Sequence, residues 1–276
     1  MRKESKYKIL LILPFLIGFV IISSLYYYYL EEILITFSVL TIEAVILAII
    51  TSIRIIIVIF CGSFLLKQWF NQDEFYLSDL PFLTGLFFLI LIPAKFLDLL
   101  SAYIGNIVSP ESLLFLLKIR FILAIINLMP MIYLSIGIVL FYFSLNEKYS
   151  SLMDKKKREK LQKYLIILIS GVELIMIIIL PTYSAIFNIV PFFVIPSLIV
   201  ILWVFIFAYR NKKLTSINSF IVSIGFGLYL LTTIFRSLGQ YVFDDAIHLI
   251  LSEMFELITN IIIFIGLVNK PKIKSD

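Results

Sequence analysis

Long apolar runs follow one another along the chain, with short polar connections between them. Each run holds roughly 20 residues or more, the length that an α-helix needs to cross the hydrocarbon core of a bilayer. A membrane β-barrel would instead show segments of about 10 residues with alternating polarity. The pattern predicts an all-α, polytopic transmembrane helix bundle with eight spans, at about 9–30, 36–66, 81–104, 113–145, 164–188, 192–210, 217–236 and 247–268.

The composition excludes a soluble globular protein. Of the 276 residues, 62% are hydrophobic and only 15% are charged, against about 25% charged in an average soluble domain. A soluble chain could not cover this much apolar surface without exposing large patches. One cysteine, Cys61, excludes a disulfide scaffold within the chain, and one histidine excludes a multi-histidine zinc site or a bis-histidine haem site. We expect no metal and no cofactor.

The first run reads as an uncleaved anchor helix over residues 1–30. Its basic start resembles the beginning of a signal peptide, but bulky tyrosines at 26–29 follow the apolar stretch. A cleavage site requires small residues, whereas tyrosines suit the interfacial belt of a membrane helix. We therefore expect an N-terminal anchor followed by a seven-helix core at 36–268.

The positions of Lys and Arg predict the orientation. Most of the 23 basic residues fall in alternate connections, and the connections near 31–35, 105–112, 189–191 and 237–246 hold none. Basic connections stay in the cytoplasm, so the pattern predicts a multi-pass protein of the cell (cytoplasmic) membrane with both termini inside. The basic residues serve this topology and do not indicate nucleic acid.

The segment 146–163 is the only sizeable polar stretch, and we expect a basic cytoplasmic loop whose residues 153–163 extend the fifth helix. Two roles remain open for it. It is either a topology anchor or a contact for a cytoplasmic protein partner or for anionic membrane lipids. No repeat or low-complexity linker divides the chain, so we expect one membrane domain over 1–276, with no soluble domain attached.

Ionisable residues gather toward the predicted outer halves of the spans. Counting from the predicted inner ends at ~1.5 Å per residue assigns eleven of them to this side: Glu43, Lys95, Asp98, Lys118, Arg120, Arg236, Asp244, Asp245, His248, Glu253 and Glu256. Steps of three or four residues put Asp245, His248, Ser252, Glu256 and Asn260 on one face of the last helix. Lys95 and Asp98 are three apart and can meet. Arg54 and Glu173 are expected at mid-depth.

Charges inside a membrane are costly and commonly face a cavity or one another, which leaves two interpretations. In one, the outer halves surround a polar pocket for a small zwitterionic or anionic ligand or an ion, with these candidate binding residues: Lys95, Asp98, Arg236, His248, Glu253 and Glu256. In the other, the charges form structural ion pairs. Arg54, Glu173 and Glu43 are expected to be structural intramembrane charges, with Arg54 and Glu173 as a candidate pair.

No catalytic motif is present. A Walker loop, GxSxG and HExxH are all absent, so we predict no catalytic residues. A nucleophilic site built from Cys61, Arg54 and His248 would require these three residues to meet in space. Prolines in or beside the spans predict kinks; these are Pro93, Pro130, Pro181 and Pro196.

The stretches 82–98, 118–121 and 256–266 lie in an arrangement of seven helices with an outer start and a cytoplasmic end. This arrangement resembles the seven-helix sensor modules of microbial histidine kinases and related signalling proteins, and we expect it to lack their output domain. The resemblance implies a membrane sensor that binds a ligand and passes a helix shift to a cytoplasmic partner through 146–163. The alternatives are a transporter of small molecules or ions, or its membrane subunit, and a membrane-embedded lipid-modifying enzyme.

Overall fold

The computed structural model is helical and describes residues 3–38, 41–74, 76–105, 107–145, 147–212, 214, 216–239, 242 and 245–270. The described residues form no strand, which confirms the predicted all-α class. The helices are α1 (Lys3–Tyr28), α2 (Leu30–Phe37), α3 (Ile42–Phe70), α4 (Leu80–Ile104), α5 (Pro110–Ser144), the 3₁₀ helix η1 (Glu147–Met153), α6 (Lys155–Ile179), α7 (Tyr183–Arg210), α8 (Ser219–Leu238) and α9 (Asp245–Val268).

The helices identify an integral membrane protein. Within the described ranges, seven of them are long and apolar enough to cross a membrane, or up to eight if the bent pair α1 and α2 forms one span. Large apolar side chains lie on the outside of the bundle, such as Ile56, 67% exposed, and Ile179, 70% exposed. Lipid tails match such a surface, whereas water does not. The eight crossings and the cytoplasmic termini remain predictions.

The predicted boundary between the fifth and sixth spans is wrong. Residues 189–191, expected to connect them, lie inside α7, and the break falls at residues 180–182. Pro181 cannot donate a backbone hydrogen bond, which favours a helix end before it. Thr182 then caps α7, because its side chain accepts a hydrogen bond from the Ala185 N–H.

The predicted connection at 31–35 is also wrong, because these residues form most of α2. The chain turns at Tyr29, where the axes of Phe15–Tyr28 and Leu30–Phe37 differ by 62°. Glu31 and Glu32, read from the sequence as a polar connection, lie in the first turn of α2. Carboxylates are favourable there because the helix N-terminus carries partial positive charge.

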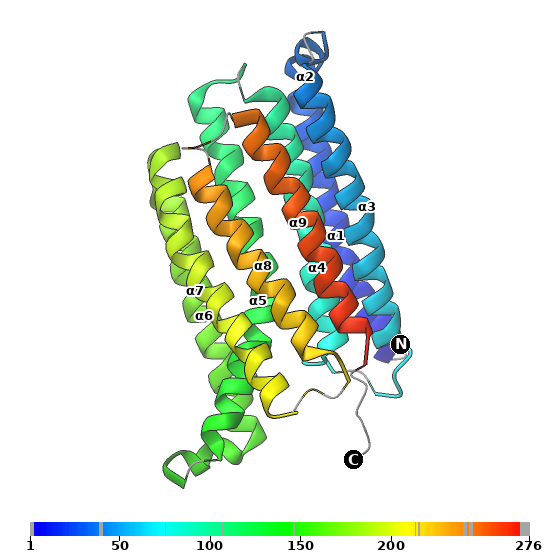
Figure 1. The fold of residues 1–276 in the computed structure, drawn as a ribbon, viewed down its shortest axis with the longest axis vertical. Helices are drawn as coiled ribbons and strands as arrows, with labels where there is room; N and C mark the ends of the chain where they lie inside the picture. Colours follow the sequence, from blue (N-terminus) through cyan, green and yellow to red (C-terminus); the bar gives the residue numbers. More distant parts are fainter. Residues whose placement is uncertain are drawn as a thin grey trace. The chain divides into compact units, whose positions relative to one another are not determined.

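The helices pack into two compact units, Met1–Asn127 and Leu128–Asp276. In the first unit, α3 packs along α4, and α1, α2 and α4 share an apolar core with the start of α5 (Figure 1). The backbones of α3 and α4 approach closely at Gly62, where a Cβ would lie 2.7 Å from the Leu89 side chain. These units describe how the helices pack, whereas the predicted single domain over 1–276 describes one membrane-inserted region. That single membrane domain stays a prediction.

A side-chain clip closes the link between α3 and α4. The indole N–H of Trp69 donates to the Tyr76 carbonyl oxygen at 3.1 Å and to the Asp79 carboxylate at 3.2 Å. The same carboxylate accepts the Tyr76 N–H at 3.1 Å. Trp69 is fully buried, so this clip fixes the polar connection to the end of α3.

In the second unit, α8 packs against both α7 and α9 (Figure 1). The α8–α9 contact is close enough for backbone to meet backbone, since a Cβ at Gly266 would lie 2.6 Å from the Val222 nitrogen. The Asn218 N–H also donates to the Gly266 carbonyl oxygen at 2.9 Å. On α6, the Gln162 side chain donates to the Tyr133 carbonyl oxygen of α5 at 2.7 Å. The expected extension of the fifth helix over 153–163 is confirmed from Lys155 onward, where α6 begins, whereas Met153 ends η1.

Candidate functional site

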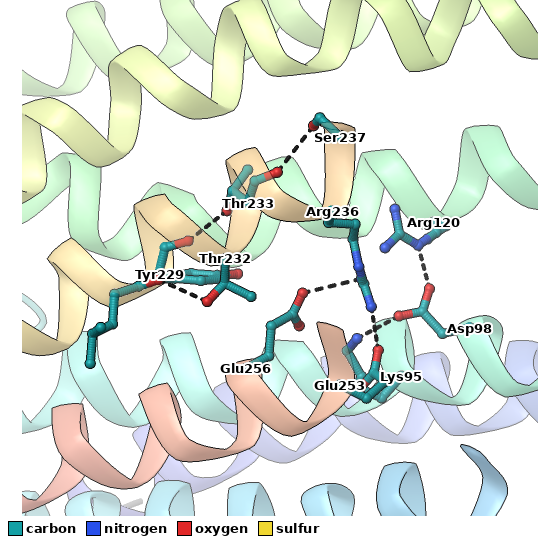
Figure 2. A network of polar contacts seen from close by, with 11 residues as sticks. Lys95, Asp98, Arg120, Tyr229, Thr232, Thr233, Arg236, Ser237, Glu253 and Glu256 are labelled. Carbon is teal, nitrogen blue, oxygen red and sulfur yellow. Dashed lines mark hydrogen bonds and ion pairs between the residues drawn. The ribbon is translucent and has the colours of Figure 1, made fainter. Parts of the chain in front are cut away.

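One group of charges joins α4 and α5 within the first unit. The Asp98 carboxylate accepts a hydrogen bond from Lys95 Nζ at 2.6 Å and another from Arg120 Nε (Figure 2). We call Lys95, Asp98 and Arg120 the α4–α5 cluster. Lys95 is buried, with 3% of its surface exposed, and the other two side chains are mostly buried. One carboxylate therefore holds two cations inside a predominantly apolar helix pair.

The spacing of residues along α4 explains one of the two contacts in the α4–α5 cluster. Lys95 and Asp98 are three residues apart on α4, and such residues are neighbours on a helix surface. Arg120 comes from α5, where its guanidinium also lies 4.9 Å from the Phe121 ring centroid. An arginine beside an aromatic ring gains a cation–π attraction, which helps to hold it at the carboxylate.

A second group of charges joins α8 and α9 within the second unit. The Arg236 guanidinium donates to Glu253 Oε1 and lies 3.2 Å from Glu256 Oε1 (Figure 2). We call Arg236, Glu253 and Glu256 the α8–α9 cluster. Both carboxylates are buried, with 2% and 6% of the residue surface exposed. Two acids three residues apart on α9 thus share one arginine on α8.

The antiparallel packing of α8 and α9 sets this pairing. Gly225 contacts Ile263 and Val222 contacts Gly266 near one end of the pair, while Gly239 contacts His248 near the other. This register brings Arg236, in the last turn of α8, level with the stretch of α9 that carries Glu253 and Glu256. Three hydroxyl groups lie on α8 on either side of Arg236. Each donates a hydrogen bond to the backbone carbonyl oxygen four residues earlier in the same helix; these residues are Thr232, Thr233 and Ser237.

Forming these buried ion pairs costs desolvation free energy, and breaking them once they have formed costs free energy as well. Removing ions from water costs several kcal/mol per ion, and a buried pair often contributes no more stability than apolar residues of the same volume. Breaking such a pair nonetheless costs about 3–5 kcal/mol, since it leaves a buried charge uncompensated. Each cluster is therefore costly to break once it has formed, and its chemistry is that of paired guanidinium, ammonium and carboxylate groups.

His248 lies near the start of α9, where it is buried with 5% of its surface exposed. Its ring lies 5.6 Å from the Phe235 ring centroid, and it packs against Gly239, which follows α8. A Cβ at Gly239 would come within 2.5 Å of the imidazole. His248 thus fills the space beside the end of α8, one turn before Ser252 on α9.

The charges expected to be structural occupy different settings. Arg54 on α3 is fully buried, and Glu173 on α6 is buried with 6% of its surface exposed. They belong to different units, and their pairing stays a prediction. Glu43 is exposed in the first turn of α3, where a carboxylate suits the helix N-terminus. Asp244 lies outside the described residues, as does the side chain of Asp245.

The described residues contain no group of three or more His, Cys, Asp and Glu side chains able to hold a metal ion. Cys61 is a buried free thiol on α3, among apolar neighbours. Cys61 and Arg54 lie in the first unit and His248 lies in the second.

Comparison of the predicted set of binding residues with the structure shows one omission. The sequence assigns Arg120 to the outer charges but not to the candidate binding residues, yet Arg120 binds Asp98 directly. No spacing rule could reveal it, because the two residues lie on different helices and 22 positions apart. A complementary charge on the neighbouring helix was the available signal, and the sequence offered two, Lys118 and Arg120.

No protein-family model matches the chain, and no curated protein and no solved structure matches it significantly.

Proposed function

We propose that this protein is a sensor or receptor-like binding module of the cytoplasmic membrane that binds a small zwitterionic or anionic molecule, or an ion, at its intramembrane charges. The observation that carries the proposal is the α8–α9 cluster, in which two buried carboxylates share one guanidinium between apolar helices. Ionisable residues within membrane helices are rare, and they usually mark ligand, ion or proton sites.

A purely structural role explains the cluster less well. Apolar side chains of the same volume would pack α8 against α9 without the desolvation penalty of three ions. The pair already has close backbone contacts at Gly225 and Gly266 and a backbone hydrogen bond from Asn218. Stability therefore does not require the charges, and binding gives them a reason to be there.

The charge pattern favours a zwitterion. Its anionic end would replace a carboxylate on the Arg236 guanidinium, and its cationic end would join Glu253 or Glu256. The α4–α5 cluster offers the opposite ratio, with two cations on one carboxylate, which suits an anionic group. Arginine favours planar carboxylate and phosphate groups, because its fork of N–H donors matches them.

Signalling would run toward the cytoplasm. The positive-inside pattern assigns both clusters to the outer halves of the spans and the segment 146–163 to the inner side. The exposed lysines at the start of α6, at 155–157, would contact a cytoplasmic partner protein or anionic lipid headgroups. A shift of the helices on ligand binding would reach that partner through α6.

A transporter is the second candidate, and the bend between α1 and α2 favours it. Transporters often bind substrate beside discontinuous helices, and this pair breaks by 62° at Tyr29. The proline-containing helices α4, α5 and α7 add sites where a helix can flex. The same charge clusters would then serve as the substrate site.

The test uses the full chain in lipid nanodiscs and a panel of probes: glycine, glycine betaine, acetate, inorganic phosphate and sodium ions. A ligand at 100 times its Kd stabilises the folded state by about 2.7 kcal/mol, so thermal midpoints detect it. We expect one probe class to raise the midpoint of the wild type but not of Glu256→Gln, while Glu43→Gln, an exposed carboxylate, responds as the wild type does. No response to any probe overturns the proposal.

Two further measurements separate the candidates. Proteoliposomes loaded with the active probe show no Glu256-dependent flux if the protein is a sensor, and flux abolished by Glu256→Gln if it is a transporter. A Lys157→Cys variant in sealed cells tests the orientation, because only a permeant reagent should label it. Labelling by an impermeant reagent would put the basic segment outside and reverse the proposed direction of signalling.

A further inference from the structure

A stripe of buried polar residues follows one face of α9. His248, Ser252, Glu256 and Asn260 recur every four residues, so their side chains lie one above another along the helix. All four are more than nine-tenths buried, with 5%, 0%, 6% and 1% of the surface exposed. From His248 to Asn260 the stripe advances twelve positions, or about 18 Å of helix axis at ~1.5 Å per residue, more than half of the ~30 Å hydrocarbon thickness.

Three members of the stripe have a buried polar atom without a hydrogen-bond partner among the described residues. These atoms are His248 Nε2, Ser252 Oγ and Asn260 Nδ2. A hydroxyl in a helix usually bonds the carbonyl oxygen of the preceding turn, as Thr232 and Thr84 do at 2.8 Å. Ser252 makes no such bond. Buried polar atoms without a protein partner are normally satisfied by ordered water.

The unsatisfied atoms lie beside the charges. Ser252 is one turn before Glu256, and Asn260 is one turn after it, so each side chain neighbours this carboxylate on the helix surface. The register of α8 and α9, fixed by the Gly239–His248 and Gly225–Ile263 contacts, puts Ser252 level with Arg236. His248 begins the stripe beside Gly239, where α8 ends.

We infer that this stripe is a water-filled track that begins at His248, passes Ser252 and hydrates the α8–α9 cluster as far as Asn260. Water fits the atoms that line it, because an imidazole nitrogen, a hydroxyl and an amide N–H together offer donors and acceptors. A divalent metal does not fit, since no metal-binding group of His, Cys, Asp and Glu occurs among the described residues. The inference goes beyond the proposed function, because the track holds water whether or not a ligand binds.

Cysteine reactivity in nanodiscs tests the inference, with a small charged methanethiosulfonate reagent as the probe. The background is the full chain with Cys61→Ala. Ser252→Cys and Asn260→Cys are compared with Met254→Cys and Ile258→Cys, whose side chains lie on the exposed face of α9, 43% and 48% exposed. A thiol must ionise to react, so a cysteine in contact with lipid tails reacts slowly. We expect the two track positions to react at least about tenfold faster than the two exposed ones, although the structure buries them. Equal or slower reaction at the track overturns the inference.

Thermal stability gives a second measurement that needs no reactive cysteine. Replacing an unsatisfied buried amide in a dry site with an apolar group of similar shape is neutral or stabilising. If water satisfies Asn260, Asn260→Leu instead lowers the thermal midpoint, by about 2–4 °C for a protein of this size. An unchanged or raised midpoint contradicts the track. Both measurements are made without added ligand, so their failure would leave the ligand proposal standing.

Discussion

Gly266→Ala tests whether α8 and α9 form one rigid pair. A Cβ at this position would lie 2.6 Å from the Val222 nitrogen, 2.8 Å from Val222 Cγ2 and 3.1 Å from the Ile221 carbonyl carbon. Two of these three atoms belong to the backbone of α8, so no side-chain rotation can make room. The helices must instead move apart, which also stretches the bond from Asn218 N–H to the Gly266 carbonyl oxygen.

The expected loss follows from these contacts. Overpacking by one carbon in a well-packed contact costs about 1–3 kcal/mol, and weakening one backbone hydrogen bond adds about 1 kcal/mol. The variant should therefore lose about 2–4 kcal/mol, a roughly 30- to 700-fold smaller folding constant. Gly171→Ala is the matched control, because nothing lies within 4 Å of its Cβ. Alanine is a better helix former than glycine, so the control should keep or raise the stability.

Unfolding by increasing sodium dodecyl sulfate in mixed micelles measures both variants, with the fluorescence of the two tryptophans as the signal. The reasoning requires a clear loss for Gly266→Ala and none for Gly171→Ala. If Gly266→Ala unfolds within about 0.5 kcal/mol of the wild type, the range of an ordinary surface substitution, then α8 and α9 do not touch as described.

Three other predictions follow from single contacts. Asp98→Asn should lower the free energy of unfolding by about 3–5 kcal/mol, because it removes the charge that pairs with both cations of the α4–α5 cluster; a loss no larger than that of Glu43→Gln in the same micelle titration would contradict this. Asn218→Ala should cost about 1 kcal/mol, because the Asn218 side chain caps the first turn of α8 through the Ile221 N–H, and unchanged stability would show the cap to be unimportant. The hydrogen bond that Tyr76 donates to the Glu74 carboxylate raises the pKa of the phenol above its ordinary value. The bond therefore stabilises the connection between α3 and α4 at pH values below the ordinary tyrosine pKa. This stabilisation is lost as the pH rises through the raised pKa of Tyr76. Glu74→Ala should therefore shift the ionisation of one tyrosine to lower pH in an ultraviolet difference titration, and superimposable curves would refute this assignment.

The sequence predicted the helices well and their ends less well. Apolar runs reveal which residues are compatible with lipid, but an apolar run continues unchanged through a turn. The break at 180–182 shows this, because apolar residues lie close on both sides of it, at Ile179 and Ile186. Pro181 and Thr182 carry the signal, a proline followed by a capping residue, whereas Pro191, in the predicted connection at 189–191, lies within α7. The bend at Tyr29 has neither proline nor glycine to mark it.

The contacts of the charge clusters were likewise predicted only in part. Spacing along one helix predicted the contact between Lys95 and Asp98, and it put Glu256 on the same face of the last helix as Ser252 and Asn260. Spacing along one helix could not predict contacts between helices, because the register of α8 against α9 depends on where their backbones can approach each other. Gly225 and Gly266 set that register, and only the packed structure reveals which residues face them.

The division of the α8–α9 cluster between two helices bears on how the chain enters the bilayer. On insertion scales, one charged side chain costs about 2.5–3.5 kcal/mol at the centre of a membrane helix and less toward its ends, where Arg236 lies in α8. If α8 entered lipid alone it would bring its arginine without the acids, and α9 alone would bring its acids without the arginine. Their mutual neutralisation favours partitioning of the two helices as a hairpin during synthesis. Ribosome-bound chains long enough to expose α8 but not α9 should therefore integrate this segment poorly.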